Sequence, residues 1–171
     1  MNHYEEMHIL ALDVRHSRMG YALFVGSRRL LNWGVSTVPP RCCNRAEWIR
    51  PRIAELLRHG SPVCVVTRPR RLAKLPRNAN GESILEAIRS VAEEHGVPMH
   101  VLGCDEIEST FCRFRARTKE EIACAIVGIF PELLVRLPLK RKKWQPEAHG
   151  MIVFDAIATG IAYWQRPPPR T

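Results

Sequence analysis

The sequence contains no uninterrupted apolar run close to the length of about 18 residues that a membrane-spanning helix needs. It also lacks a CxxC pair, although it has six cysteines, so the usual ligand spacing of a structural zinc site is missing. The opening residues, MNHYEEMH, carry two glutamates and not the basic and then apolar pattern of a secretory signal. These absences predict a cytoplasmic protein with reduced thiols and no membrane partner. Cys64 and Cys124 lie in apolar stretches, which predicts that both are small core residues.

Acidic residues are scarce relative to basic ones. The 171 residues include 26 Lys and Arg against 17 Asp and Glu, which gives a formal net charge of +9. A basic surface favours a polyanionic partner, either nucleic acid or an acidic membrane, although a basic protein need have no such partner. The basic runs fall between the expected elements and not along one amphipathic helix, which disfavours a membrane surface. Nucleic acid is therefore the partner that we expect.

The length and the apolar content of 46% predict a single domain over 1–171, with a proline-rich tail at 165–171. Three apolar runs joined by short links predict an antiparallel meander, and two further strands alternate with helical segments. The expected strands are 8–14, 19–25, 30–38, 62–66 and 97–102, and the expected helices are 44–60, 83–95, 105–114, 118–130 and 151–164. This order predicts an α/β fold, with a mixed five-stranded sheet of three antiparallel and then two parallel strands, covered by helices.

Two acidic residues stand in apolar surroundings. Asp13 ends the first expected strand, HILALDV, and Asp155 lies inside the apolar helical segment MIVFDAIATGIAYW. A buried carboxylate costs free energy unless it is paired or used, so Asp13 could cap a turn, Asp155 could bind an arginine, or the two could converge. Two converging carboxylates suit Mg²⁺, and a pair of such ions can support phosphodiester hydrolysis. Asp13 and Asp155 are therefore candidate metal ligands and catalytic residues.

Two further polar residues precede the last expected helix. Glu147 is either a third metal ligand or a first-turn charge that the helix dipole favours. His149, six residues before Asp155, either hydrogen-bonds a phosphate, assists proton transfer or simply stands at the start of the helix. The sequence leaves these alternatives open for both residues.

Basic segments supply candidate phosphate contacts. Clustered cations neutralise phosphates and release counterions, and a neighbouring tryptophan can stack on a base. Each segment taken separately is equally compatible with a solvated surface. The candidate nucleic-acid-binding residues are Arg68, Arg70, Arg71, Lys74, Lys140, Arg141, Lys142, Lys143 and Trp144. A further alternating run contains Arg113, Arg115, Arg117 and Lys119.

With these residues identified, the chain resembles the RuvC-like branch of the RNase H-like superfamily over nearly its whole length. The segment HILALDVRHSRMGYALF is similar to the family's first hairpin with its metal-binding aspartate. Residues 118–164 are similar to the C-terminal part, in which a basic, tryptophan-containing connector leads into a helix that carries acidic ligands. The resemblance implies an RNase H-like fold and Mg²⁺- or Mn²⁺-dependent cleavage of branched or structured DNA, such as four-way junctions in recombination and repair, often by a homodimer.

Two positions depart from the family pattern. Thr67 follows the strand PVCVV, where the family usually has a glutamate that bridges the metals. Ala148 stands where an acidic residue is often found, and helical spacing would put that residue on the same face as Asp155. Because a threonine hydroxyl is neutral and does not bridge metals, the sequence also predicts an alternative function. In this alternative, the chain is a RuvC-like nucleic-acid-binding module that no longer cuts and works within a larger nucleoprotein assembly.

Overall fold

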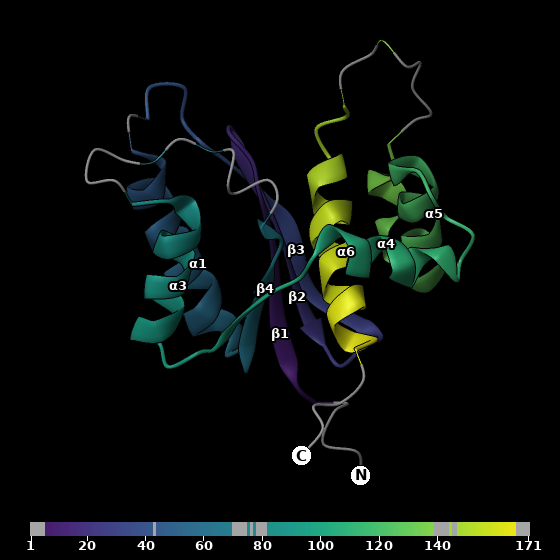
Figure 1. The fold of residues 1–171 in the computed structure, drawn as a ribbon, viewed down its shortest axis with the longest axis horizontal. Helices are drawn as coiled ribbons and strands as arrows, with labels where there is room; N and C mark the ends of the chain where they lie inside the picture. Colours follow the sequence, from purple (N-terminus) through teal and green to yellow (C-terminus); the bar gives the residue numbers. More distant parts are fainter. Residues whose placement is uncertain are drawn as a thin grey trace.

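A five-stranded sheet forms the middle layer of the computed structural model, which describes residues 6–42, 44–69, 75, 77, 82–138, 144 and 147–166 (Figure 1). The strands are β1 His8–Val14, β2 Arg18–Val25, β3 Arg29–Thr37, β4 Cys64–Thr67 and β5 Met99–Val101. They lie in the order β3-β2-β1-β4-β5. β1 pairs antiparallel with β2 and β2 with β3, whereas β4 pairs parallel with both β1 and β5. The predicted mixed sheet is confirmed.

Helices cover both faces of this sheet (Figure 1). α1 Arg45–Gly60 and α3 Ile84–Glu94 pack together on one face. α6 Met151–Trp164 lies on the other face, with α4 Cys104–Cys112, α5 Lys119–Ile129 and the 3₁₀ turn η2 Pro131–Arg136. Apart from η2, the predicted order of strands and helices is confirmed. None of the helices in the described residues is both long and apolar enough to cross a membrane.

A capping box fixes the start of α5. The side chain of Thr118 accepts a hydrogen bond from the backbone N–H of Glu121, and the Glu121 carboxylate accepts one from the backbone N–H of Thr118. These two bonds satisfy backbone donors that the first turn of a helix leaves unpaired. The cap therefore sets the first helical residue, Lys119, in a defined place at the end of α5.

Alternation along β1 decides which face of the sheet Asp13 joins. Ile9 and Ala11 pack in the core cluster that includes α6, whereas Leu10 and Leu12 pack in the cluster that includes α1 and α3. Successive side chains of a strand point to opposite faces, so position 13 continues the α6 face. Asp13, which is only 1% exposed, therefore lies on the side of the sheet that α6 covers.

Two glycines let α6 approach the sheet closely. A Cβ added at Gly20 of β2 would lie 2.3 Å from the backbone oxygen of Ile152. A Cβ added at Gly160 of α6 would lie 2.2 Å from the Phe24 ring. Every residue from 151 to 162 is buried as a result. This close packing fixes the distance between α6 and the strands β1 and β2, and with it the position of Asp155, the acidic residue of α6.

The cysteines of the described residues are all free thiols: Cys42, Cys64, Cys104, Cys112 and Cys124. Cys64 is buried in β4, as predicted, and burial raises the pKa of its thiol. The prediction that Cys124 lies in the core is wrong, because it is exposed. α5 buries only the face that carries Ala123 and Ile126, and Cys124 lies off that face.

Candidate functional site

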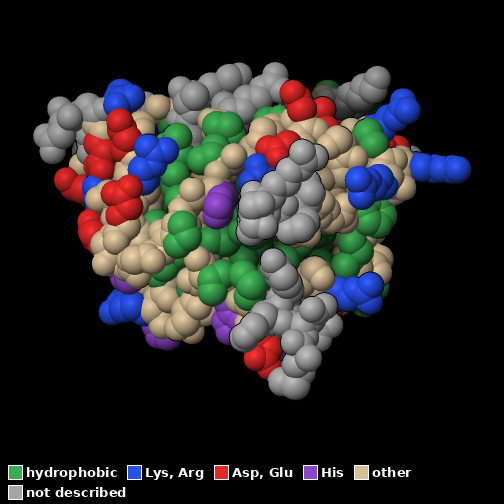
Figure 2. All heavy atoms as spheres, turned by 60° about the horizontal axis from the view of Figure 1, so that its bottom comes forward, with side chains coloured by type: hydrophobic (Ala, Val, Ile, Leu, Met, Phe, Trp, Pro, Cys, Tyr) green, Lys and Arg blue, Asp and Glu red, His purple; other side chains and the backbone are tan. Residues whose placement is uncertain are grey.

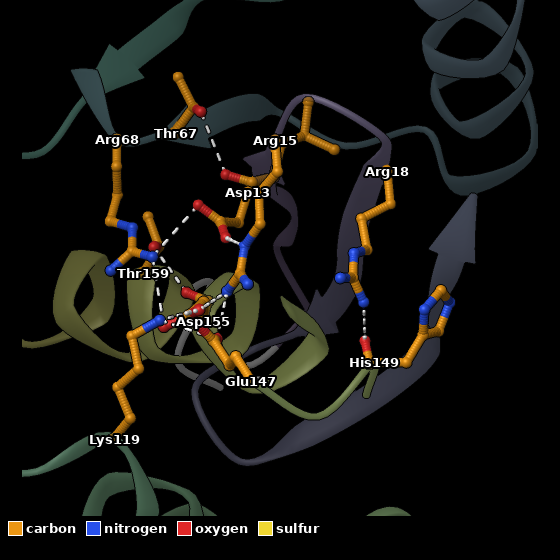
Figure 3. Close-up of polar contacts among 11 residues, drawn as sticks. Asp13, Arg15, Arg18, Thr67, Arg68, Lys119, Glu147, His149, Asp155 and Thr159 are labelled. Carbon is orange, nitrogen blue, oxygen red and sulfur yellow. Dashed lines mark hydrogen bonds and ion pairs between the residues drawn. The ribbon is translucent and has the colours of Figure 1, made fainter. Parts of the chain in front are cut away.

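Asp13 and Asp155 lie side by side at the end of β1 (Figure 3). A single nitrogen of Arg68, Nη2, is 3.1 Å from Asp13 Oδ1 and 3.3 Å from Asp155 Oδ1. Arg15 also contacts both aspartates, through Nε and Nη2. The two carboxylates are 1% and 7% exposed. A strand residue and a helix residue far apart in the sequence therefore meet in one small buried volume.

Glu147 joins these two aspartates from the segment just before α6. Its Oε1 is 2.8 Å from Arg15 Nη2 and 2.8 Å from Lys119 Nζ. The same lysine nitrogen is 3.2 Å from Asp155 Oδ2. The three acidic residues that the sequence analysis singled out are thus connected through shared cations.

Three carboxylates and three cations make up this arrangement. We call Asp13, Arg15, Arg68, Lys119, Glu147 and Asp155 the ion-pair cluster. The cations come from the link between β1 and β2, from the residue after β4, and from the first turn of α5. All four carboxylate oxygens of the two aspartates contact a cationic nitrogen. The formal charge of the cluster is therefore zero.

Electrostatic interactions shift the pKa of three cluster residues, Arg15, Arg68 and Glu147, against the effect of burial. Burial would lower the pKa of Arg15 and Arg68, but the charges of Asp13 and Asp155 outweigh burial and raise both values. Burial would likewise raise the pKa of Glu147, but hydrogen bonds from its two cationic partners, together with their charges, lower it to about 2. Both guanidinium groups and the Glu147 carboxylate are therefore charged at neutral pH.

Arg68, and not Thr67, is the residue of the β4 segment that faces Asp13. β1 and β4 pair in parallel with Leu12 opposite Thr67, so the next pair along the strands is Asp13 with Arg68. The buried Thr67 hydroxyl donates a hydrogen bond to the backbone oxygen of Leu12, 3.1 Å away. The resemblance pointed to Thr67 as the place of the missing glutamate. The strand register instead gives the position beside Asp13 to a cation.

The prediction that Ala148 shares a helical face with Asp155 is wrong. α6 begins at Met151, and the Ala148 carbonyl accepts a hydrogen bond from the Met151 N–H, 3.0 Å away, in the turn before it. Helical spacing carries no meaning for a residue outside the helix. The same helix start excludes the alternative that Glu147 is a first-turn charge of α6.

The His149 side chain does not join the ion-pair cluster. His149 is exposed, and Figure 3 shows its ring pointing away from the carboxylates. Its backbone oxygen accepts a hydrogen bond from Arg18 Nη1 at 3.1 Å. The bond ties the segment before α6 to the start of β2. The His149 ring therefore does not contact the carboxylates of the cluster, with which it would have to act in a proton transfer.

No sequence pattern marked Arg15, Arg68 or Lys119 as an ion-pair partner of the acids, and Arg68 was predicted as a phosphate contact. Arg15 belongs to the short link after the first strand, and Lys119 belongs to a basic run taken as a phosphate contact. The alternative that Asp155 binds an arginine is confirmed by its contacts with Arg15 and Arg68. Charge balance was the signal for such a cation, because a buried carboxylate requires one nearby. Arg15 follows Asp13 by two residues and satisfies that requirement locally.

Most of the candidate nucleic-acid-binding residues lie outside the described residues. These are Arg70, Arg71, Lys74, Lys140, Arg141, Lys142 and Lys143. Of the other two, Trp144 is 77% exposed, whereas the Arg68 side chain is 11% exposed and is held by the aspartates. Exposure of the Trp144 ring is compatible with stacking on a base.

An open pocket of about 370 Å³ adjoins the ion-pair cluster. Arg117, Lys119 and Asp155 line it together with apolar side chains of α4, α5 and α6, among them Ile122 and Phe154. The cluster therefore borders a hollow that a ligand can enter, although its aspartates are buried.

A pair of divalent metal ions does not fit the residues of this cluster. Carboxylate oxygens are the donors that Mg²⁺ and Mn²⁺ prefer. However, the aspartate oxygens already contact cationic nitrogens, and an added metal ion would meet those positive charges at short range. Within the described parts of the chain, no three His, Cys, Asp or Glu residues are arranged to hold a metal. The predicted metal ligands Asp13, Glu147 and Asp155 are ion-pair partners in this structure.

Two solved structures have a fold similar to that of this chain. Thermus thermophilus RuvC, solved in complex with a Holliday junction substrate, matches with a TM-score of 0.64 and 21% identity over 91% of this chain and 91% of that chain. The yeast mitochondrial Holliday junction resolvase Ydc2 matches with a TM-score of 0.55 and 13% identity over 95% of this chain and 80% of that chain. No family model and no curated protein matches the sequence. The chain therefore has an RNase H-like fold similar to that of RuvC.

Proposed function

We propose that this protein binds branched or otherwise structured DNA as a junction-resolvase-like protein. The observation that carries the proposal is the similarity of its fold to two junction resolvases over 91% and 95% of the chain, one of them solved on a junction substrate. The net charge of +9 supports a polyanionic partner, since cations that contact phosphates release counterions from DNA.

The proposed DNA-binding surface is the end of the molecule that carries the ion-pair cluster. In the sequence, the basic segment 68–74 follows β4, and the basic segment 140–144 comes before α6. The end of β4 lies beside the ion-pair cluster, and so does the N-terminal part of α6, which carries Asp155. Figure 2 turns the other end of the molecule forward. On the coloured part of that face, cationic side chains are scattered among neutral ones and acidic side chains gather toward α1 and α3. The face in this view therefore shows no single cationic patch among its coloured side chains.

The chain's own residues supply binding in two ways. Cations of the basic segments neutralise phosphates, and the exposed Trp144 ring stacks on an unpaired base near a branch point. The three carboxylates would repel a phosphate if they were unpaired. Because the ion-pair cluster is neutral overall, that repulsion is small and the DNA backbone can approach the pocket beside Asp155.

Metal-dependent cleavage of the bound DNA, in recombination or repair, is a second candidate function. The convergence of Asp13, Glu147 and Asp155 favours it. A homodimer would then place two such sites symmetrically on a four-way junction. This candidate requires Mg²⁺ or Mn²⁺ to displace the cations of the cluster, a step for which the chain's geometry offers no support.

An electrophoretic mobility shift with a labelled four-way junction tests the proposal, with a linear duplex of the same sequences as control. We expect the junction to bind at lower protein concentration than the duplex, in EDTA as well as in Mg²⁺. Equal binding of the two DNAs would contradict the proposal. Incubation of the same junction with Mg²⁺ or Mn²⁺ tests the second candidate, since cutting that Asp13→Asn abolishes would establish it.

A further inference from the structure

We infer that Arg15, Arg68 and Lys119 take the place of divalent cations in the carboxylate cluster, so that the cluster forms and persists without metal. Three acidic side chains from β1, α6 and the segment before α6 lie around three cationic side chains from three other places in the chain. The inference concerns the cluster itself and does not depend on whether the chain binds DNA.

The contacts are those of specific pairs and not of a diffuse charged surface. The Arg15 and Arg68 side chains are 13% and 11% exposed, and each contacts both aspartates. Lys119 bridges Glu147 and Asp155 at 2.8 and 3.2 Å. Charged hydrogen bonds of this kind are strong when water is largely excluded.

The Arg68 side chain is largely buried, although one of its nitrogens has no hydrogen-bond partner in the described part of the chain. Its Nε is buried and has no hydrogen-bond partner among the described residues, which costs free energy. The side chain is nevertheless buried, because its Nη2 serves Asp13 and Asp155 together. Its position follows from the register of β4 against β1, so a backbone-anchored cation stands opposite Asp13.

The three cations balance the charge of the three carboxylates in the cluster. Three carboxylates without counterions would repel one another at short range and would take up metal ions to relieve the repulsion. With three buried or partly buried cations present, the cluster is neutral, and a metal ion gains no net attraction. Removal of a metal ligand and removal of an ion-pair partner therefore have opposite effects on stability in metal-free buffer.

Thermal unfolding in EDTA of the purified full chain and of its Asp13→Asn and Asp155→Asn variants tests whether each substitution lowers or raises the Tm. In an ion-pair cluster, each substitution leaves a buried arginine short of a partner, and we expect the Tm to fall by roughly 5 °C or more. In a metal site kept free of metal, the same substitutions relieve repulsion and raise the Tm. A rise for either variant would overturn the inference.

Metal rescue gives an independent measurement. We expect millimolar Mn²⁺ to leave the wild-type Tm unchanged, and Arg68→Ala to lower the Tm in EDTA and to regain part of the loss in Mn²⁺. Arg50→Ala is the matched control, since Arg50 is a partly exposed arginine that pairs with Glu82 and Glu94 on the other face of the sheet. Mn²⁺ stabilisation of the wild type beyond that of this control, or an Arg68→Ala variant as stable as the wild type in EDTA, would overturn the inference. If Arg68→Ala does not fold, the two asparagine variants still decide the sign.

Discussion

Asp13 is only 1% exposed, and burying a charged side chain costs free energy unless opposite charges stand beside it. Arg15 lies two residues away in the chain, and Arg68 reaches it from the neighbouring strand. Breaking a buried pair by removing one partner typically costs about 3–5 kcal/mol, whereas an exposed ion pair contributes about 1 kcal/mol or less. Single residues of the cluster therefore matter more to this fold than the many surface arginines.

Glu147 gives the cluster a defined response to acid. Its pKa is about 2 in the folded protein, against 4.5 for the free group, so its ion pairs contribute stability above about pH 4.5 that is lost as the pH falls toward 2. We expect the Glu147→Gln variant to lose stability less steeply than the wild type across this range, by about one proton of uptake. Urea unfolding at several pH values measures this difference, and parallel curves for the two proteins would contradict it.

The sequence marks the acids of the site better than it marks the cations. Asp13 and Asp155 stand out because their neighbours are apolar, and that contrast is a local property of the chain. Nothing local distinguishes Arg68 or Lys119 from the other basic residues, because their role depends on which elements meet in space. For the same reason, both residues were predicted as phosphate contacts.

At the scale of elements, the close approach of α6 to β2 is the most constrained packing contact described. We expect Gly20→Ala to destabilise the protein by about 1–3 kcal/mol or more, because the added methyl group meets the backbone of Ile152 and not a side chain that can move. Chemical denaturation of the purified variant measures the loss.

Gly128→Ala in α5 is the matched control for this prediction. A Cβ at Gly128 meets nothing within 4 Å, and the residue is exposed in the last turn of α5. We expect this variant to be more stable than the wild type by about 0.5–1 kcal/mol, since alanine loses less backbone entropy than glycine. A Gly20→Ala variant that retains wild-type stability would show that α6 can shift on the sheet.

Element boundaries were predictable where side chains mark them. The capping box at Thr118 fixes the start of α5, and the apolar segment 151–164 matches α6 at both ends. The segment before α6 carries no cap, so the sequence did not show that Ala148 lies outside the helix. Without a cap to mark the start of α6, helical spacing was extended back to Ala148, and its placement on the same face as Asp155 was predicted wrongly.

At the scale of the whole molecule, the fold places the opposite charges of the ion-pair cluster at one end of the sheet. In the sequence, the basic segment 68–74 follows β4 and the basic segment 140–144 comes before α6. We expect a variant with Lys140, Arg141, Lys142 and Lys143 changed to Ala to bind a four-way junction more weakly. The plot of log affinity against log salt should lose about 0.9 of slope for each phosphate contact removed. Filter binding at several salt concentrations measures both quantities.

The double variant Arg28→Ala and Arg29→Ala controls for net charge. Both arginines are exposed at the turn between β2 and β3, at the opposite end of the sheet from Asp13. We expect this variant to keep nearly the wild-type slope. An equal loss of slope per charge removed in the two variants would mean that overall charge, and not the cluster end of the molecule, sets the affinity for DNA.

Composition predicted a nucleic-acid partner, which stays a prediction, and short apolar runs joined by short links predicted the strands of the sheet. The convergence of β1 and α6 required the strand order and the choice of face, which no local pattern encodes. Odd-numbered residues of β1 share the α6 face, and this geometry links the first element of the chain to the last.

The distance along the chain between β1 and α6 also matters while the protein is being made. The face of β1 and β2 that carries Ile9, Ala11 and Phe24 is covered by a helix that the ribosome releases more than a hundred residues later. Until then this apolar surface is exposed to the cell, where it is a site for premature aggregation. Nascent chains arrested before residue 151 should therefore associate with chaperones that bind apolar segments, and completed chains should not.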